Sequence, residues 1–244
     1  MFARVVMIFV QAPIWGSQHI KNPILVGMAA SMSLLIFPSV PVPKEFPTEI
    51  RGFIPLLLMQ LAVGLVIGWV SFLVMATAQF GGELLDIQMG LSAAAAADPS
   101  SHGAINLIRR LKFYMIMLLY LLTDGHLNFW KAIQRSFVLL PGTSFHITTG
   151  LMDRMIDMGA DIYIIGLQLA SPVVGALLVA QVSLGLMARV APQMNVFMLS
   201  FPMNLGVGMI LLTASMPYLM EVFNLQLDLN LDHVQEIILL LKPH

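Results

Sequence analysis

Two carboxylates and a pair of arginines stand in the middle of an otherwise apolar chain, and they are the side chains best suited to chemistry there. Glu83 and Asp86 are three positions apart, so on a helix they share one face. Ionisable residues in apolar segments are costly and usually face a bundle interior, a cavity or an opposite charge. We predict that they line an aqueous path or pair with Arg109, Arg110 or a partner's cation. In the alternative, the helix ends near Gly81–Gly82 and water solvates both carboxylates.

A second polar group interrupts the apolar C-terminal half of the chain. Arg189 separates two long apolar runs, and Gln193 and Asn195 follow within two helical turns. Pro192 removes a helix hydrogen bond at this point. The sequence therefore predicts either a short turn outside the apolar layer or a polar contact with a neighbouring subunit.

Enzymatic and metal chemistry find little support in the residue types. The chain has no cysteine, which removes disulfides, thiolate metal ligands and cysteine nucleophiles. Its six histidines are scattered, and no HExxH, GxSxG, P-loop or dinucleotide fingerprint occurs. A net charge of −1 offers no basic surface for nucleic acid. We expect a non-enzymatic protein with no catalytic residue, metal site, cofactor or nucleic-acid partner.

The elements that carry these residues must be membrane helices. Hydrophobic residues make up 58% of the chain and charged residues 10%, against about 25% charged in soluble domains. Uncharged runs reach 31 residues at Gly52–Gly82 and 27 at Ile162–Ala188, whereas a spanning helix needs about 20. We predict an all-α integral membrane protein of about five to six hydrophobic helices, kinked by internal prolines and buried in a multi-subunit assembly.

Small residues occur in two patterns. One allows helix backbones to approach closely, and the other forms a loop whose side chains occupy little space. Gly64 and Gly68, and likewise Ser171 and Gly175, have the four-residue spacing that lets membrane helices pack closely. Residues 92–97 are all Ser or Ala, and a polar, turn-like segment follows. Such side chains suit a loop that leaves a narrow channel without breaking large apolar contacts, although an alanine run also suits a helix end.

Several segments together resemble one known family. The segment 186–202, LMARVAPQMNVFMLSFP, resembles the signature of the FliR family, the flagellar type III export-gate proteins whose injectisome counterpart is SctT. Segments near the start and in the middle are similar to the family's early Arg, its Ala-Pro-x-Phe-Gly turn and its polar loop with the following helix. The matching residues are Arg4, Ala12–Gly16, Ala97–Pro99, Asp124–His126, Arg189, Ala191–Gln193, Asn195, Phe197 and Pro202.

The resemblance carries expectations about domains, partners and location. It implies one FliR/SctT-like membrane domain over residues 1–244, with a central polar loop at about 92–108 and a C-terminal amphipathic tail at about 221–244. It implies a protein of the bacterial inner membrane, in the flagellar basal body. There, FliP, FliQ and this protein would form the export gate through which unfolded flagellar subunits pass, and FlhB would dock on that complex.

The family also contributes a loop that plugs the closed gate. By sequence position the resemblance places this plug in the small-residue stretch described above. The implied plug residues are Ser92, Ala93, Ala94, Ala95, Ala96, Ala97, Asp98, Pro99, Ser100, Ser101, His102 and Gly103.

The alternative function is a small-solute secondary transporter or channel. It would use Glu83, Asp86 and Arg189 as an intramembrane polar path. Such a protein carries a complete pathway in one chain, often built from internal repeats. The sequence has no convincing repeat and is short of polar lining, which favours the export component.

Overall fold

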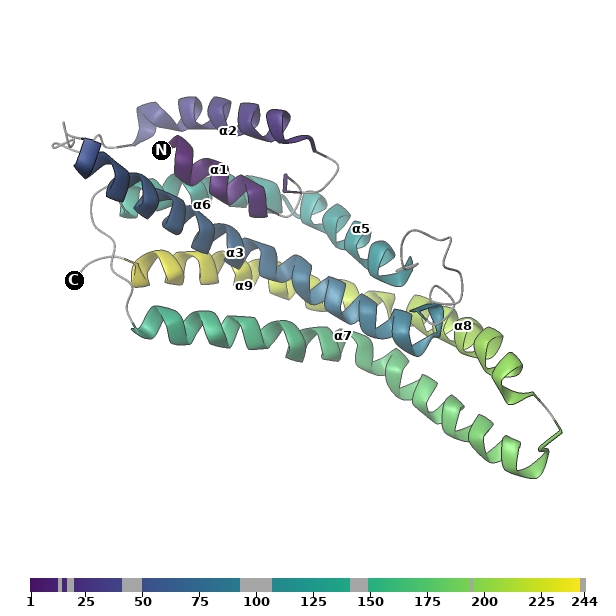
Figure 1. The fold of residues 1–244 in the computed structure, drawn as a ribbon. Coiled ribbons are helices and arrows are strands. Elements are labelled where there is room, and N and C mark those ends of the chain that lie inside the picture. Colours follow the sequence, from purple (N-terminus) through teal and green to yellow (C-terminus); the bar gives the residue numbers. More distant parts are fainter. Residues whose placement is uncertain are drawn as a thin grey trace. The chain divides into compact units, whose positions relative to one another are not determined.

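The structure is a computed structural model that describes residues 1–12, 15–16, 20–40, 50–92, 107–140, 149–193 and 195–241. Within these ranges all regular structure is helical, as predicted (Figure 1). The α-helices are α1 (Phe2–Gln11), α2 (Asn22–Ile36), α3 (Ile50–Gln88), α5 (Leu107–Leu122), α6 (Gly125–Leu139), α7 (Thr149–Val190), α8 (Val196–Ala214) and α9 (Met216–Leu240), and a 3-10 turn, η1 (Phe37–Ser39), follows α2.

Helix length decides which segments can cross a membrane. Among the described residues, three segments are long and apolar enough: Asn22–Ser39, Arg51–Gln88 and Thr149–Val190. A fourth is possible if α8 and α9, which meet at a bend after Ala214, form one broken span. The 10 residues of α1 measure only about 15 Å, half of a bilayer's apolar thickness. The described helices thus give three to four candidate spans, where the apolar runs suggested five to six hydrophobic helices.

The chain divides into two compact units. Unit 1 contains Met1–Val74, Tyr120–Gly159 and Leu225–His244, and unit 2 contains Met75–Leu119 and Ala160–Asn224. Because the unit boundaries fall inside α3, α5, α7 and α9, each of these helices contributes one segment to each unit.

In unit 1, glycines let α1 pack directly on α3. A Cβ atom at Gly64 would lie 2.5 Å from the carbonyl oxygen of Arg4, and one at Gly68 would lie 3.2 Å from the Cα of Ile8. At Gly64 a side chain larger than hydrogen would force the two backbones apart, and at Gly68 it would be a tight fit, so the close packing predicted for this pair is confirmed. Gly175 differs, because a Cβ there would meet nothing within 4 Å in the described part of the chain.

Unit 2 has its own apolar core. Residues from α3, from the segment directly after it, and from α5, α7 and α8 pack into one cluster that excludes solvent. This cluster holds the end of α3 and the start of α5 in place. Glu83, Asp86 and Arg109 lie at these two helix ends. Its buried members are Leu85, Met89, Leu91, Ile108, Ala170, Val173, Leu177 and Leu212.

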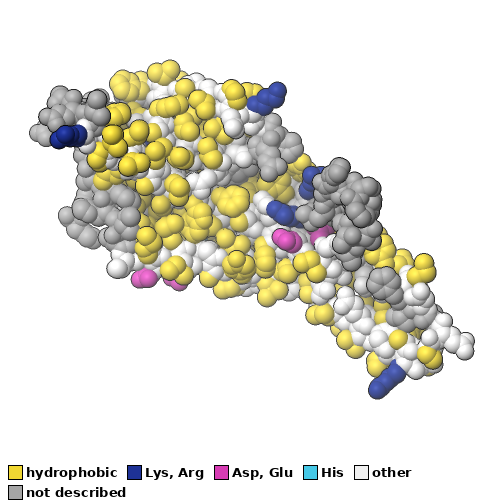
Figure 2. All heavy atoms as spheres, viewed as in Figure 1, with side chains coloured by type: hydrophobic (Ala, Val, Ile, Leu, Met, Phe, Trp, Pro, Cys, Tyr) yellow, Lys and Arg dark blue, Asp and Glu magenta, His cyan; other side chains and the backbone are white. Residues whose placement is uncertain are grey.

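Many large apolar side chains stay on the surface. Leu34 is 75% exposed, Met198 75% and Val190 86%. Hydrophobic side chains are spread widely over the described part of the face shown in Figure 2, and charged side chains are few there. A surface of this kind is stable only where lipid or partner proteins cover it.

Candidate functional site

Asp86 joins the end of α3 to the start of α5. Its Oδ1 atom accepts the backbone N–H of Ile108 at 2.9 Å, and its Oδ2 atom accepts the backbone N–H of Arg109 at 3.0 Å. The first N–H groups of a helix have no partner within that helix. Asp86 is fully buried and caps the N-terminus of α5 with both oxygens, where the helix dipole also favours its negative charge.

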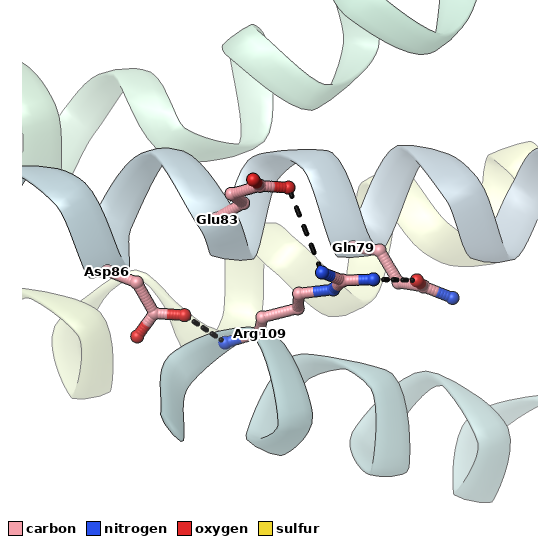
Figure 3. Close-up of polar contacts among 4 residues, drawn as sticks. All are labelled: Gln79, Glu83, Asp86 and Arg109. Atoms are coloured by element: carbon pink, nitrogen blue, oxygen red, sulfur yellow. Dashed lines mark hydrogen bonds and ion pairs between the residues drawn. The ribbon is translucent and has the colours of Figure 1, made fainter. Parts of the chain in front are cut away.

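Arg109 makes the return contacts to α3. Its Nη2 atom donates to Oε1 of Gln79 at 2.9 Å, and its Nη1 atom lies 4.0 Å from Oε2 of Glu83 (Figure 3). Gln79, Glu83 and Asp86 follow one another at separations of four and three, so they share one face of α3. We call these four residues the α3–α5 clasp.

The ion pair of the clasp and the backbone hydrogen bonds of Asp86 differ in strength because they differ in exposure. The side chains of Arg109 and Glu83 are 38% and 53% exposed, and at 4.0 Å such a pair contributes little to stability. Asp86, in contrast, is 0% exposed and makes charge-assisted bonds to two backbone amides. The hydrogen bonds of Asp86 are therefore the part of the clasp that contributes most to stability.

Two glycines bring α3 close to its neighbours at this point. A Cβ atom at Gly82 would lie 2.6 Å from the Cα of Arg109, and one at Gly81 would lie 2.8 Å from the carbonyl oxygen of Gly166 on α7. The helix continues through both glycines to Gln88. The alternative in which it ends near Gly81–Gly82 and leaves both carboxylates in water is therefore wrong. These glycines mark helix crossings, because any larger side chain would hold the backbones apart.

Lys112 follows the clasp by one turn of α5, a helix that is not among the candidate spans. The residue is 2% exposed, and its Nζ atom has no hydrogen-bond partner among the described residues. Burial in apolar surroundings lowers the pKa of Lys112 to about 8, and the nearby negative charge of Asp86 acts in the opposite direction.

Among the described residues of unit 1, the buried charge is Arg4. Its Nε atom donates to Oε1 of Gln60 at 2.8 Å, while Nη1 and Nη2 donate to the carbonyl oxygens of Ser136 at 2.9 Å and Leu140 at 3.0 Å. These carbonyls end α6, so the guanidinium caps a helix C-terminus, where the helix dipole favours a cation. The same group lies 4.4 Å from the ring centre of Phe137.

The chemistry available to these groups is the positioning of helices. Asp86 and Arg4 direct their charges to backbone groups at helix ends, which would otherwise be buried without partners. In the part of the chain that the structure describes, no group of three or more His, Asp or Glu side chains could hold a metal ion.

The sequence as a whole matches one known family. The profile of bacterial export proteins, family 1, matches residues 1–229 of the 244. The chain belongs to this family.

Relatives within the family agree with the resemblance to FliR. The flagellar biosynthetic protein FliR of Pectobacterium carotovorum subsp. carotovorum is 30% identical over 236 residues, covering 93% of this chain and 90% of that protein. FliR of Escherichia coli (strain K12) is 30% identical over 234 residues, 93% and 89% of the two chains. Yop proteins translocation protein T of Yersinia pestis is 25% identical over 214 residues, 86% and 81%. The protein is thus a membrane component of a flagellar or type III export apparatus.

Three residues predicted for a polar path or for subunit contacts meet in this FliR-family chain. Glu83, Asp86 and Arg109 come together in the clasp, where the guanidinium of Arg109 lies near Glu83, while Asp86 accepts the backbone N–H of Arg109 and makes no ion pair with its guanidinium. Arg110, the next residue, has an exposed side chain. Their role in a path or at a subunit contact stays a prediction.

The family signature lies at the connection between α7 and α8. Arg189 is exposed in the last turn of α7, and Gln193 is exposed in the turn that follows. Asn195 caps α8, because its Oδ1 atom accepts the backbone N–H of Met198 at 3.3 Å. The structure thus places a turn here, and a subunit contact through the exposed residues stays a prediction.

The implied plug lies between the two helices that the clasp joins. Ser92 is a half-buried helical residue, whereas Ala93 to Gly103 lie outside the described residues. The chain is described again from Leu107, the first residue of α5. The clasp therefore joins α3, which precedes this stretch in the chain, to α5, which follows it.

Three residues at these sites received no role from the sequence alone, namely Arg4, Gln79 and Lys112. Arg4 is the one charged residue ahead of Lys21, and a lone charge in an apolar helix signals a buried partner. Its partner carbonyls lie 132 and 136 residues away, which no local pattern predicts. Gln79 has the helical spacing to Glu83 that would have placed it in the clasp.

Proposed function

We propose that this chain is the FliR-like subunit of the flagellar type III export gate. With FliP-like and FliQ-like membrane subunits it forms the channel through which unfolded flagellar subunits cross the bacterial inner membrane, and an FlhB-like switch protein docks on that complex. The observation that carries the proposal is the similarity to FliR of P. carotovorum and E. coli, which covers 93% of this chain in each case.

The exposed apolar surface supports a place within an assembly. On α2, Leu34 and Leu35 are 75% and 71% exposed, and on α8, Met198 and Ile210 are 75% and 71% exposed. Side chains of this size need an apolar neighbour. Packing against the helices of partner subunits and against lipid supplies it.

The contacts of Asp86 speak against the solute-transporter alternative. A transport site needs polar atoms that are free to exchange a substrate or an ion. Both oxygens of Asp86 instead accept backbone amides, and the residue is fully buried. Removing them from those amides to bind a solute would uncap α5.

Purification in mild detergent with an affinity tag, followed by mass spectrometry, tests the proposal directly. We expect FliP-like and FliQ-like membrane proteins to copurify in fixed ratio with the tagged chain. A clean monomer or a homo-oligomer would contradict the proposal and would favour a self-contained transporter.

A genetic and a transport assay separate the two functions further. We expect deletion of the gene to abolish motility, and re-expression to restore it, with no change in solute uptake. The purified chain alone in liposomes is expected to give no substrate flux above empty vesicles. Measurable flux by the chain alone would overturn the export role.

A further inference from the structure

Lys112 combines a buried positive charge with an apolar pocket. Three of the residues that line the pocket follow Lys112 along α5, and three lie on the first turns of α9. The pocket has a volume of about 20 Å³, which is room for one group the size of a water molecule. The lining residues beside Lys112 are Met115, Ile116, Leu119, Leu219, Met220 and Phe223.

Among the described residues, the ammonium group of Lys112 lacks the partner that burial demands. Its Nζ atom makes no hydrogen bond in the described part of the chain, and the residue is only 2% exposed. Burying an ionised group without a partner is strongly unfavourable, so such charges are normally paired. The six lining residues are apolar and supply no hydrogen-bonding side chain.

Asp86 is the nearby anion, and it is already engaged. Its charge acts on Lys112, yet its two oxygens accept the backbone amides of Ile108 and Arg109 at 2.9 and 3.0 Å. A move of the carboxylate toward Lys112 would leave those two amides without their acceptor. The missing counter-charge must therefore come from outside the clasp.

The size and apolar lining of the pocket favour a carboxylate as the counter-charge. A carboxylate oxygen is close to the size of a water molecule and fits the available volume. A phosphate group brings four oxygens against the two of a carboxylate, and the six apolar lining residues offer no side-chain donor to the additional oxygens. Met220, at the rim, is 46% exposed, so the pocket opens at the surface, and the four-methylene stem of lysine lets the ammonium reach toward the rim.

We propose that Lys112 is the cationic half of an ion pair between subunits, and that it receives the carboxylate of an Asp or Glu from an apolar helix of a partner membrane protein. Apolar residues next to that acidic side chain pack on Met115, Leu119 and Met220. The inference rests on the proposed function to the extent that it requires a partner subunit.

The Lys112→Met variant tests the proposal through the sign of its effect. In the isolated chain in detergent, the substitution removes an unpaired buried charge, so we expect the thermal midpoint to rise by several degrees. In the copurified complex the substitution leaves the partner's carboxylate without its counter-charge. We therefore expect the thermal midpoint of the complex to fall or the partner to be lost. Lys112→Arg keeps the charge and is expected to retain the partner.

Two controls separate this proposal from simpler accounts. Lys131→Met, at an exposed lysine on α6, is expected to leave both midpoints unchanged. The isolated wild-type and Lys112→Met chains are also compared in nanodiscs of phosphatidylcholine with and without cardiolipin. We expect the rise in midpoint for Lys112→Met to be the same in both lipid mixtures.

Each contrary result has a distinct meaning. If Lys112→Met stabilises the complex as it does the isolated chain, or leaves the complex unchanged, Lys112 has no partner carboxylate and the proposal is wrong. If cardiolipin alone reverses the sign in the isolated chain, the counter-charge is a lipid phosphate, and the proposal is again wrong. Failure of the wild-type chain to copurify with any partner would overturn the proposed function first, and the two failures are therefore distinguishable.

Discussion

The Oδ1 atom of Asp86 accepts the backbone N–H of Ile108 at 2.9 Å, although the two residues are 22 positions apart in the chain. The cap of α5 thus comes from another helix. Because the stretch between α3 and α5 contains the implied plug, one carboxylate fixes the spacing between the helices on either side of it.

Replacing Asp86 tests the cap. We expect Asp86→Ala to lower the free energy of unfolding by about 1–3 kcal/mol, because two buried amides lose their acceptor. Asp86→Asn keeps one acceptor oxygen and is expected to lose less. Thermal unfolding in detergent gives the stability, and hydrogen exchange at the amides of Ile108 and Arg109 reports the cap itself.

Glu83→Gln is the matched control for Asp86, because Glu83 lies on the same face of α3 but its side chain is 53% exposed. We expect a loss below about 1 kcal/mol and unchanged hydrogen exchange at the start of α5. Equal effects of the Asp86 and Glu83 variants would rule out the cap as the main contribution of the clasp.

Gly82→Ala tests the close approach of α3 and α5. The added Cβ atom would lie 2.6 Å from the Cα of Arg109, a backbone atom that cannot move aside alone. We expect a loss of at least about 1–3 kcal/mol and faster exchange at the start of α5. Gly175→Ala, where a Cβ meets nothing within 4 Å, is expected to be neutral or to stabilise α7 by up to about 1 kcal/mol. The idea fails if Gly82→Ala is as well tolerated as Gly175→Ala.

Arg4 is expected to be the most sensitive residue of unit 1. Arg4→Ala leaves the carbonyls of Ser136 and Leu140 and the Gln60 side chain without the guanidinium, for a loss of about 1–3 kcal/mol for each acceptor that finds no other donor. Arg4→Lys keeps the charge but lacks the several N–H donors that the planar guanidinium holds in a fixed geometry, so it is expected to recover only part of this loss. Thermal melts in detergent measure both, and the exposed Lys131→Ala is the control. Full recovery by Arg4→Lys would mean that charge alone matters.

The ion pair between Arg154 and Glu236 joins α7 to α9 within unit 1 and should contribute little. Its atoms lie 3.0 Å apart, but the side chains are 31% and 45% exposed. A double-mutant cycle with Arg154→Ala and Glu236→Ala is expected to give a coupling of about 0.2–1 kcal/mol that falls as salt is added. A larger coupling that is insensitive to salt would show that the pair is buried in its membrane setting.

Deletion of residues 92–103 tests the implied plug. If this stretch seals the closed gate, the assembled complex without it should leak small ions. Ion flux in vesicles that carry the complex is the measurement, with Asp86→Asn as a variant that retains the whole stretch. An intact ion barrier in the deletion would remove the plug assignment.

The sequence by itself determined the fold class and the family. Long uncharged runs require helices in an apolar layer, since backbone groups there must bond within their own segment. The helical spacing of Glu83 and Asp86 placed them on one face, and the segment 186–202 gave the resemblance to FliR that the match over residues 1–229 confirmed. These are local properties, and local periodicity is what a sequence displays directly.

Only the tertiary structure decided what each charge contacts. Composition could not separate a solvated Asp86 from one that caps a distant helix, and it gave no partner for Arg4, whose carbonyl acceptors lie 132 and 136 residues away. It also left open whether Gly82 ends a helix or lies at a crossing. Such contacts depend on which helices the folded chain brings together, because a charge that is buried in one packing arrangement is solvated in another.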